Sequence, residues 1–271
     1  MKIVQATGQT CNQFWIYSNC LADAIEKKEK FAIWIPDIAF EYFPHLLDSE
    51  LISYPLYSKK LASLFGYKQY IKVLKTLFGN KFSIRFFNFL INLLPNQSFI
   101  IADVFIEKSK YRYKNLERLL ASYTPLESIV LKVDDFMCAI RDEYEIIIGV
   151  HIRYGDYRTY NNGKYFYTLE EYSDFFKNIK KIFKGKKIAF YIVSNEVIDV
   201  TFFKDYNCFY LPNSLMVEDL YSLSKTDYII GPPSTFSGWA SLRGNTPLFF
   251  LEDSKCNFEF SDFIDIKDVW F

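Results

Sequence analysis

The sequence has few of the residues that bind metal ions. Its 271 residues include two histidines, His45 and His151, and its five cysteines show no Cys-x-x-Cys spacing, so the usual patterns of zinc and iron sites are missing. No Asp-x-Asp pair occurs, although many enzymes hold Mn²⁺ or Mg²⁺ with such carboxylates. The P-loop and the Gly-x-Ser-x-Gly elbow are missing too. The sequence therefore predicts a site without metal.

Long apolar runs and a signal peptide are also missing. No stretch of 18 apolar residues occurs, so no transmembrane helix is predicted, and residues 1–4 already have the pattern of a first strand. The net charge is zero, so nothing indicates a nucleic-acid partner. The simplest interpretation of the odd number of cysteines is reduced thiols in the cytoplasm: Cys11, Cys20, Cys138, Cys208 and Cys256.

Acidic residues are missing from one long segment. Residues 51–102 contain no Asp or Glu but carry six lysines and Arg85. Basic residues interleaved with Phe, Tyr and Leu on predicted helices suit an anionic membrane, which would place the chain peripherally on the inner face of the membrane. The alternative is an ordinary solvated helical face over a core. Binding to anionic liposomes distinguishes the two.

Half of the residues are hydrophobic, which is enough for two domains of ordinary size. The chain opens with a strand at 3–6, a glycine turn, a helix at 12–29 and a strand at 31–35. This is a βαβ pattern. Residues 57–94 are predicted to be helical, and the chain returns to strand near 98–104.

The second half alternates more regularly between strands and helices. Thr168 and Glu171 have the spacing of a capping box at the start of its first helix. This alternation predicts a doubly wound parallel sheet, and we expect two domains, 1–135 and 136–271, that face one another across a cleft. The predicted strands are 146–151, 188–193, 208–211, 228–230 and 247–251, and the predicted helices are 169–183, 217–224 and 234–242.

Polar residues follow the apolar strand at 146–150. His151, Arg153 and Asp156 lie where the strand ends, and ligands of open α/β sheets bind at that edge. The planar fork of Arg153 suits a bidentate contact with a phosphate. The alternative is a surface loop in which Arg153 pairs with Asp156. His151 either contacts the ligand or orients the loop.

A second candidate lies between a predicted strand and a predicted helix at 231–240. Two prolines prevent an earlier helix start, and Ser234 or Thr235 makes a good N-cap. The same geometry builds an anion site from free N–H groups, the helix dipole and the hydroxyls of Ser234, Thr235 and Ser237. Three hydroxyls in four positions favour the anion site.

Two weaker candidates follow other strands. Gly8 begins a turn that leads through Asn12 and Gln13 into a helix, and it does not have the Gly-x-Gly-x-x-Gly pattern of a dinucleotide site. Ser194 follows the strand at 188–193. Without a metal, the charge of a bound diphosphate would be met by Arg153, hydroxyls and backbone N–H groups.

Three motifs resemble those of one enzyme family. His-x-Arg-x-Gly-Asp-Tyr at 151–157, Ser-Thr-Phe-Ser-x-Trp-Ala at 234–240 and Gly-x-x-x-Asn-Gln at 8–13 look like the bacterial α-1,2-fucosyltransferases, which are related to the α-1,6- and protein O-fucosyltransferases. Val217-Glu218-Asp219-Leu220-Tyr221 agrees as well. The resemblance spans nearly the whole chain except 51–102.

The resemblance implies a GT-B-like fold with two Rossmann-like domains and no cofactor. It also implies GDP-fucose as the donor, inversion at the sugar carbon, and an oligosaccharide or lipid-linked glycan as the acceptor, in the synthesis of a surface polysaccharide. Domain 136–271 would bind the donor and domain 1–135 the acceptor. Catalytic roles would fall to Arg153, Asp156 and His151, donor contacts to Arg153, Tyr154, Ser194, Ser234, Thr235, Phe236 and Ser237, and cleft positions to Gly8, Asn12 and Gln13.

The chain departs from the family pattern at two places. Tyr154 stands where the family usually has a second arginine, and Gly238 where it often has a bulky aromatic residue. These departures leave another nucleotide sugar, or a non-catalytic nucleotide-binding homologue, open as alternatives. Asp156 is the carboxylate nearest to Arg153 in the sequence, and it either deprotonates the acceptor hydroxyl or braces the loop.

Overall fold

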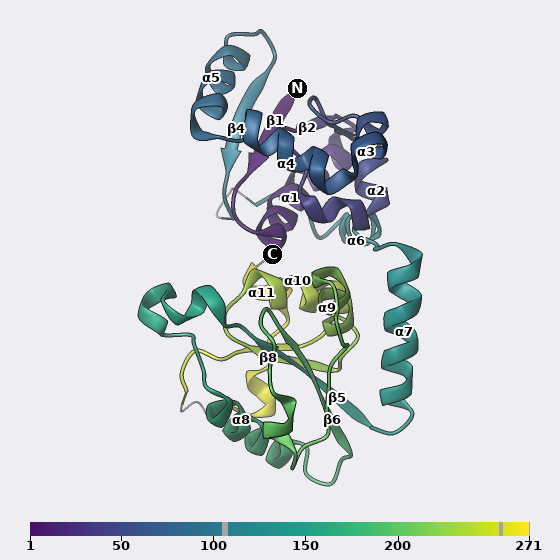
Figure 1. Ribbon diagram of the computed structural model, residues 1–271, viewed down its shortest axis with the longest axis vertical. Helices are drawn as coiled ribbons and strands as arrows, with labels where there is room; N and C mark the ends of the chain where they lie inside the picture. Colours follow the sequence, from purple (N-terminus) through teal and green to yellow (C-terminus); the bar gives the residue numbers. More distant parts are fainter. Residues whose placement is uncertain (105–107, 255–256, 271) are drawn as a thin grey trace. The chain divides into compact units, whose positions relative to one another are not determined.

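The computed structural model describes residues 1–104, 108–254 and 257–270 (Figure 1). The chain divides into two compact units, of which the first is Met1–Leu126 and the second begins at Glu127. Each unit has a parallel sheet with helices on both faces, so the predicted α/β class is confirmed. In the described ranges, no helix is long and apolar enough to cross a bilayer. Cys11, Cys20, Cys138 and Cys208 are free thiols, and Cys256 lies outside the described residues.

The first unit is built on the βαβ pattern predicted at its start. Strand β1 (Lys2–Ala6) leads through Gly8 to α1 (Thr10–Lys27) and then to β2 (Phe31–Ile33), which pairs with β1 in parallel. In the described part of the unit, β3 (Ile52–Ser53) and β4 (Ser98–Ala102) complete a parallel sheet of order β3-β2-β1-β4. The first crossover leaves β1 on one side and β4 joins it on the other.

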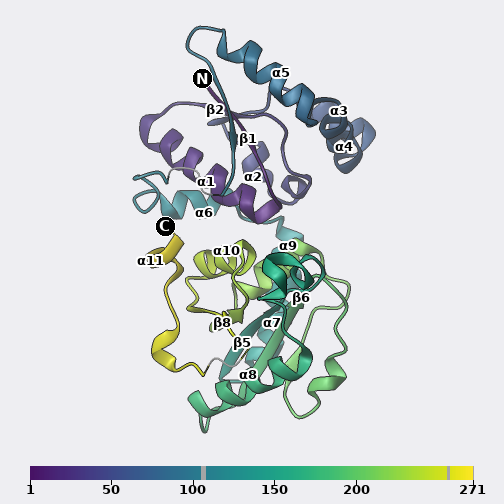
Figure 2. The ribbon, with the colours of Figure 1, turned by 90° about the vertical axis from the view of Figure 1, so that its left-hand side faces the viewer.

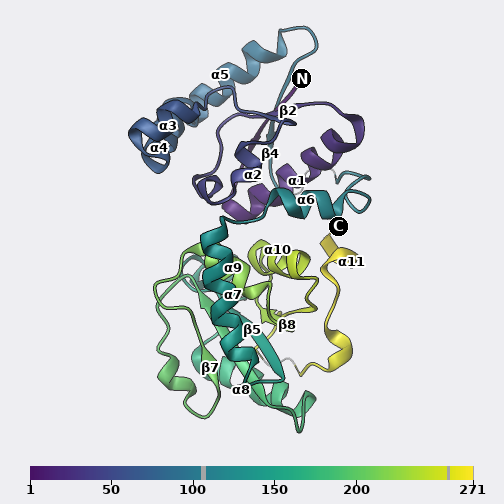
Figure 3. The ribbon, with the colours of Figure 1, turned by 90° about the vertical axis from the view of Figure 1, so that its right-hand side faces the viewer.

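Helices cover both faces of this sheet. Figures 2 and 3 show α1 and α6 (Leu116–Ser122) on one face, and α4 (Tyr67–Phe78) and α5 (Lys81–Asn92) on the other. Helices α4 and α5 cover a core cluster that includes Trp34 and Phe99. The remaining helices in the described part of this unit are η1 (Ile38–Tyr42), a short 3-10 helix, α2 (Pro44–Leu47) and α3 (Lys59–Phe65).

The second unit contains the doubly wound sheet predicted from the sequence. Among the described residues, its strands lie in the order β7-β6-β5-β8-β9, and every neighbouring pair is parallel. The predicted strands and helices differ from the observed ones by one or two residues at their ends. The strands are β5 (Ile146–Ile152), β6 (Ile188–Ser194), β7 (Cys208–Phe209), β8 (Tyr228–Gly231) and β9 (Leu248–Phe250), and the helices are α7 (Glu127–Arg141), α8 (Leu169–Ile182), α9 (Met216–Leu223), α10 (Thr235–Gly244) and α11 (Ile266–Trp270).

Alternation along β5 decides which side chains meet which helices. Ile148, Val150 and Ile152 belong to the core cluster that α8 covers. Successive strand residues point to opposite faces, so Gly149 and His151 face the side of α9 and α10. The capping box predicted for α8 is confirmed, because the Glu171 N–H donates to Thr168 Oγ1 at 3.3 Å and the Thr168 N–H donates to Glu171 Oε2 at 2.8 Å.

Candidate functional site

The topology of the second sheet points to one edge as its binding site. The chain leaves β5 toward β6 and β7 and then returns to β8 on the opposite side of β5. In such sheets the crevice beyond the carboxyl ends of the two strands at the reversal receives the ligand. His151 and Arg153 stand at the end of β5, and residues 232–237 follow β8. Two of the predicted motifs therefore meet at this crevice.

His151 lies near the end of β5 and is buried against β8 and α10. The residue is 3% exposed, and the centre of its ring lies 5.0 Å from that of Phe236. Glycine at position 231 allows β8 to approach His151 closely, because a Cβ at that position would lie 2.8 Å from both the Cβ and the carbonyl oxygen of His151. The His151 carbonyl accepts a hydrogen bond from the hydroxyl of Tyr172 at 3.2 Å. Phe236 therefore lies against the imidazole, while Tyr172 holds the main chain of His151.

Burial also fixes the charge of this imidazole. Loss of solvation lowers the pKa of His151 from 6.5 to about 3, with a further contribution from the positive charge of Arg153. The ring is therefore neutral near pH 7. Its Nδ1 is buried and has no hydrogen-bond partner among the described residues. Buried polar atoms are nearly always paired, so an unpaired one beside a crevice fits a ligand contact.

Arg153 lies beside the same crevice and is 16% exposed at its side chain. Its Nη2 is 2.8 Å from Asp156 Oδ1, and its guanidinium lies 5.5 Å from the ring centre of Tyr157. The Tyr157 hydroxyl donates to the carbonyl oxygen of Pro233 at 2.6 Å. Tyr157 therefore connects the loop of residues 153–158, the arginine loop, to the segment before α10. The sequence had not assigned a role to this tyrosine.

The start of α10 fits the N-cap interpretation and, in part, the anion-site interpretation. Ser234 is the N-cap, since its Oγ accepts from the Phe236 N–H at 3.2 Å. Ser237 is fully buried, and its hydroxyl donates to the Ser234 carbonyl at 3.2 Å. Two of the three hydroxyls thus make contacts inside the first turn. The positive end of the dipole of this helix, including the Thr235 position, still faces the crevice end of the sheet.

Tyr154 lies in the hydrophobic core, although the resemblance made it a donor-binding position. It is 9% exposed, its ring centre lies 4.9 Å from that of Phe166, and its N–H donates to Asn195 Oδ1 at 2.8 Å. The guanidinium carbon of Arg158 lies 5.3 Å from the ring centre of Tyr154. The same guanidinium makes a bidentate ion pair with the Glu196 carboxylate, with both contacts 2.7 Å long.

The end of β6 supports this loop from the neighbouring strand. Ser194 is aligned with Ile152 in the sheet, and its Oγ accepts from the Glu196 N–H at 3.2 Å. The neighbouring Asn195 and Glu196 make the contacts to Tyr154 and Arg158 just described. The predicted position Ser194 therefore belongs to the turn that anchors the arginine loop.

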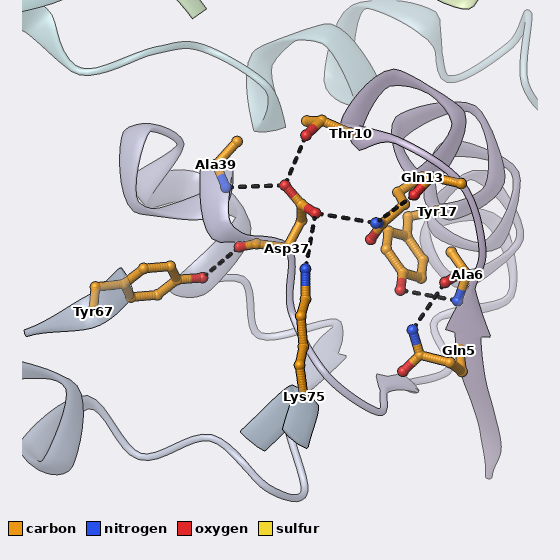
Figure 4. A network of polar contacts seen from close by, with 10 residues as sticks. Gln5, Ala6, Thr10, Gln13, Tyr17, Asp37, Ala39, Tyr67 and Lys75 are labelled. Carbon is orange, nitrogen blue, oxygen red and sulfur yellow. Dashed lines mark hydrogen bonds and ion pairs between the residues drawn. The ribbon is translucent and has the colours of Figure 1, made fainter. Parts of the chain in front are cut away.

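The glycine turn of the first unit is organised by Asp37, which the sequence had not singled out (Figure 4). The Asp37 carboxylate accepts from the Thr10 hydroxyl at 2.8 Å and from the Gln13 amide at 3.0 Å. The same amide group donates to the Gly8 carbonyl at 3.2 Å. Gly8 has φ +81, and a Cβ there would overlap the side chain of Asn12. Gly8, Asn12 and Gln13 are thus brought together within this unit.

Asp37 is also joined to helix α4 on the opposite face of the first sheet. Its carboxylate accepts from the Ala39 N–H at 3.0 Å and lies 3.5 Å from the ammonium group of Lys75 on α4. The Tyr67 hydroxyl donates to the Asp37 carbonyl at 2.9 Å. Asp37 follows a strand and Pro36 and begins η1, and an aspartate in that place is the pattern of an N-cap. That local pattern was the only signal for it in the sequence.

The side chains described at these two sites do not form a group that could bind a metal ion. In the described part of the chain, no three His, Cys, Asp or Glu side chains come together as a possible metal site.

Comparison with known proteins places the fold. No protein-family model matches the chain, and no curated protein sequence matches it significantly. The fucosyltransferase NodZ from Bradyrhizobium is similar with a TM-score of 0.57 at 15% identity, over 97% of this chain and 96% of that chain. A variant of FUT1 from Arabidopsis thaliana, solved with GDP, gives 0.57 at 13% identity over 93% of this chain and 71% of that chain. POFUT1 in complex with GDP-fucose gives 0.56 at 12% identity over 93% and 98%. At these identities the likeness establishes a shared fold, and the predicted GT-B-like class with two Rossmann-like α/β units is confirmed.

Proposed function

We propose that this chain is a glycosyltransferase that moves fucose from GDP-fucose to a hydroxyl of a glycan acceptor, with inversion and without a metal ion. The observation that carries the proposal is the crevice beyond β5 and β8. There a shielded arginine, a neutral histidine with an unpaired nitrogen and a helix N-terminus lie together. NodZ has been solved after soaking with GDP-fucose, and it shares this fold. The motif resemblance favours the α-1,2 linkage.

In this proposal the second unit holds the donor. Arg153 makes charge-assisted hydrogen bonds to the diphosphate, and the dipole of α10 adds to the positive potential around Thr235 and Ser237. The His151 Nδ1 gains a partner when the donor binds, which removes the cost of an unpaired buried polar atom. Phe236 supports the His151 ring. Asp156 holds the guanidinium of Arg153 in place and acts as a positioning residue.

The reaction is a single displacement at the anomeric carbon of fucose. The acceptor oxygen forms a bond to that carbon, the bond from the carbon to the β-phosphate oxygen breaks, and GDP leaves with the electron pair. The acceptor hydroxyl passes its proton to solvent water as the new bond forms. Negative charge grows on the departing diphosphate, so fixed cations and N–H groups around it lower the barrier. Arg153 supplies the fixed positive charge in this crevice without a metal.

The glycine turn of the first unit is the proposed contact for the acceptor. Asn12 and Gln13 offer amide groups, which suit sugar hydroxyls because each can both donate and accept. Asp37 fixes Gln13 and Thr10 and thereby keeps the turn in one shape. The acceptor class that fits is an oligosaccharide or a lipid-linked glycan.

The test compares two arginines of the second unit. Arg153→Ala removes the diphosphate contact, and each charge-assisted hydrogen bond contributes about 1.5–3 kcal/mol. We expect at least about a 100-fold fall in kcat/KM for GDP-fucose. The control is Arg141→Ala, because Arg141 also pairs with a carboxylate, Asp227, which precedes β8 at the opposite end of the strand. Release of GDP in the presence of a panel of glycans gives the rate.

The same assay, together with calorimetry, distinguishes the proposed fucosyltransferase from a transferase of another sugar and from a non-catalytic protein. Normal turnover of GDP-fucose by Arg153→Ala would refute the donor site. Release of nucleotide from a different nucleotide sugar, with none from GDP-fucose, would change the donor and keep the mechanism. GDP binding detected by calorimetry, without transfer to any acceptor from any nucleotide sugar, would identify a nucleotide-binding protein without catalysis.

A further inference from the structure

The helices α3, α4 and α5 form a layer over one face of the first sheet. Helix α4 packs against both α3 and α5, and Figures 2 and 3 show the three helices along the same side of the unit. Helices α4 and α5 contribute to the core cluster around Trp34. Their other sides point away from the sheet. We call the outward sides of these three helices the basic helical face.

Helix α5 has two apolar sides. Ile84, Phe87 and Ile91 pack on the core cluster. Phe82 and Phe89, which are seven positions apart and therefore lie on one stripe of the helix, are 80% and 65% exposed. An ordinary surface helix carries polar residues on its outer side. The outer side of α5 therefore does not fit a role that ends with covering the core.

The neighbouring helices continue this exposed apolar surface. On α3, Leu64 and Phe65 are 72% and 61% exposed, and on α4 Val73 and Leu77 are each more than half exposed. Large exposed apolar residues are normal when they are scattered singly. When they gather on adjacent helices they mark a surface that meets another molecule or a membrane.

The charges on this face all have one sign. The charged groups of four basic side chains have no ion-pair or hydrogen-bond partner among the residues that the structure describes: Lys60, Lys72, Lys81 and Arg85. The other three lysines of the segment pair with acids from outside it: Lys59 with Asp48, Lys68 with Glu41 and Lys75 with Asp37. The segment 51–102 supplies no acid of its own. The unpaired cations are therefore a net positive charge directly beside the exposed phenylalanines and leucines.

We propose that the basic helical face docks on the surface of an anionic lipid bilayer. Exposed Phe and Leu side chains enter the boundary between headgroups and acyl chains, and the unpaired cations meet the lipid phosphates. Charge complementarity selects an anionic bilayer over a neutral one. A second copy of this chain would bring the same positive charge against itself, which disfavours that occupant. The inference stands on this surface alone and does not depend on the proposed sugar transfer.

The experiment is vesicle flotation with the full chain. We expect binding to vesicles of phosphatidylcholine mixed with phosphatidylglycerol and little binding to phosphatidylcholine alone. Raising the salt to about 0.5 M should release the protein, because charges at the surface are screened. The charge variant carries Lys60→Gln, Lys72→Gln, Lys81→Gln and Arg85→Gln. Each basic residue contributes about fivefold to binding, so we expect this variant to bind at least about 50-fold more weakly.

A matched control removes the same number of charges elsewhere. It carries Lys30→Gln, Lys181→Gln, Lys184→Gln and Lys204→Gln, all of which are exposed, and it should bind like the original chain. A third variant, Phe82→Gln with Phe89→Gln, keeps all charges and removes two exposed rings. We expect it to bind at least about tenfold more weakly, because each buried aromatic ring contributes more than 1 kcal/mol. Both substituted rings are exposed, so folding should be unaffected.

Several results would overturn the proposal. One is no binding to anionic vesicles at low salt, and another is equal loss of binding in the charge variant and its matched control. Concentration-dependent dimers in analytical ultracentrifugation that the Phe82→Gln, Phe89→Gln variant abolishes, without vesicle binding by the original chain, would assign the face to a second copy. Transfer of fucose to a free oligosaccharide should be unaffected by the charge variant, so failure of the docking proposal and failure of the proposed activity are separate results.

Discussion

The neutral, buried His151 makes the stability of the second unit depend on pH in a defined direction. Burial lowers the pKa of His151 from 6.5 to about 3. Between these two values the unfolded chain binds a proton that the folded chain does not. The free energy of unfolding therefore falls as the pH falls through this window, and it is fully recovered above about pH 6.5.

The size of the effect follows from the same shift. One pKa unit corresponds to about 1.4 kcal/mol, so lowering the pH from 8 to 5 should remove about 2 kcal/mol from the free energy of unfolding through this group alone. In His151→Asn no such proton is bound. The loss between pH 8 and pH 5 should therefore be about 2 kcal/mol smaller in the variant than in the original chain. Other groups contribute equally to both and cancel in the difference.

Urea unfolding at a series of pH values measures this difference. Trp239 is buried in α10 of the second unit, so unfolding of that unit contributes to the change in the tryptophan fluorescence of the chain. The other histidine provides the control, since His45 is exposed and lies in the first unit. His45→Asn should keep the pH dependence of the original chain. An identical pH dependence in His151→Asn and in the original chain would refute the burial of a neutral imidazole at this position.

Three further predictions follow from single contacts. Gly231→Ala should lower the free energy of unfolding in urea titration by about 1–3 kcal/mol, because the added methyl group meets the backbone of His151 at 2.8 Å. An unchanged urea midpoint would mean that β5 and β8 do not lie so close together. Asp37→Ala should lower the free energy of unfolding by about 3 kcal/mol, because the buried Gln13 amide loses one of its acceptors. Thermal unfolding measures this loss. Asp156→Asn should raise the KM for the donor about two- to fivefold and leave kcat within about threefold, because Asp156 braces the arginine that binds the diphosphate and an exposed ion pair contributes at most about 1 kcal/mol. A 100-fold fall in kcat would instead make Asp156 the base.

The second sheet could be predicted because its strands are coded by short, local patterns. Ile146-Ile147-Ile148 in β5 and the apolar run of β6 are long enough for their periodicity to identify a strand buried on both faces. Helix α7 was not predicted, although its buried residues Ile129, Val133, Met137 and Ile140 have helical spacing. That signal was present in the sequence, but it lies near the expected domain boundary.

Other features could not be read from local patterns. Tyr154 lies next to Arg153 in the sequence but belongs to the core, because the backbone turns after β5 and the Asn195 side chain holds its N–H. Asp37 acquires its importance from Thr10, Gln13 and Lys75, which lie in three different parts of the chain. No spacing rule connects these residues.

The sequence by itself determined most of the strands and helices, the scarcity of metal-binding residues and the acid-free basic segment, because each is a property of composition or of neighbours a few residues apart. Only the tertiary structure decided that Arg153 is linked through Tyr157 to Pro233, which lies 76 residues after Tyr157, and that His151 is neutral. It also decided which side of α5 covers the core and which side is exposed. The physical reason is that burial, and the charge state that follows from it, depend on strand order and on contacts between distant segments.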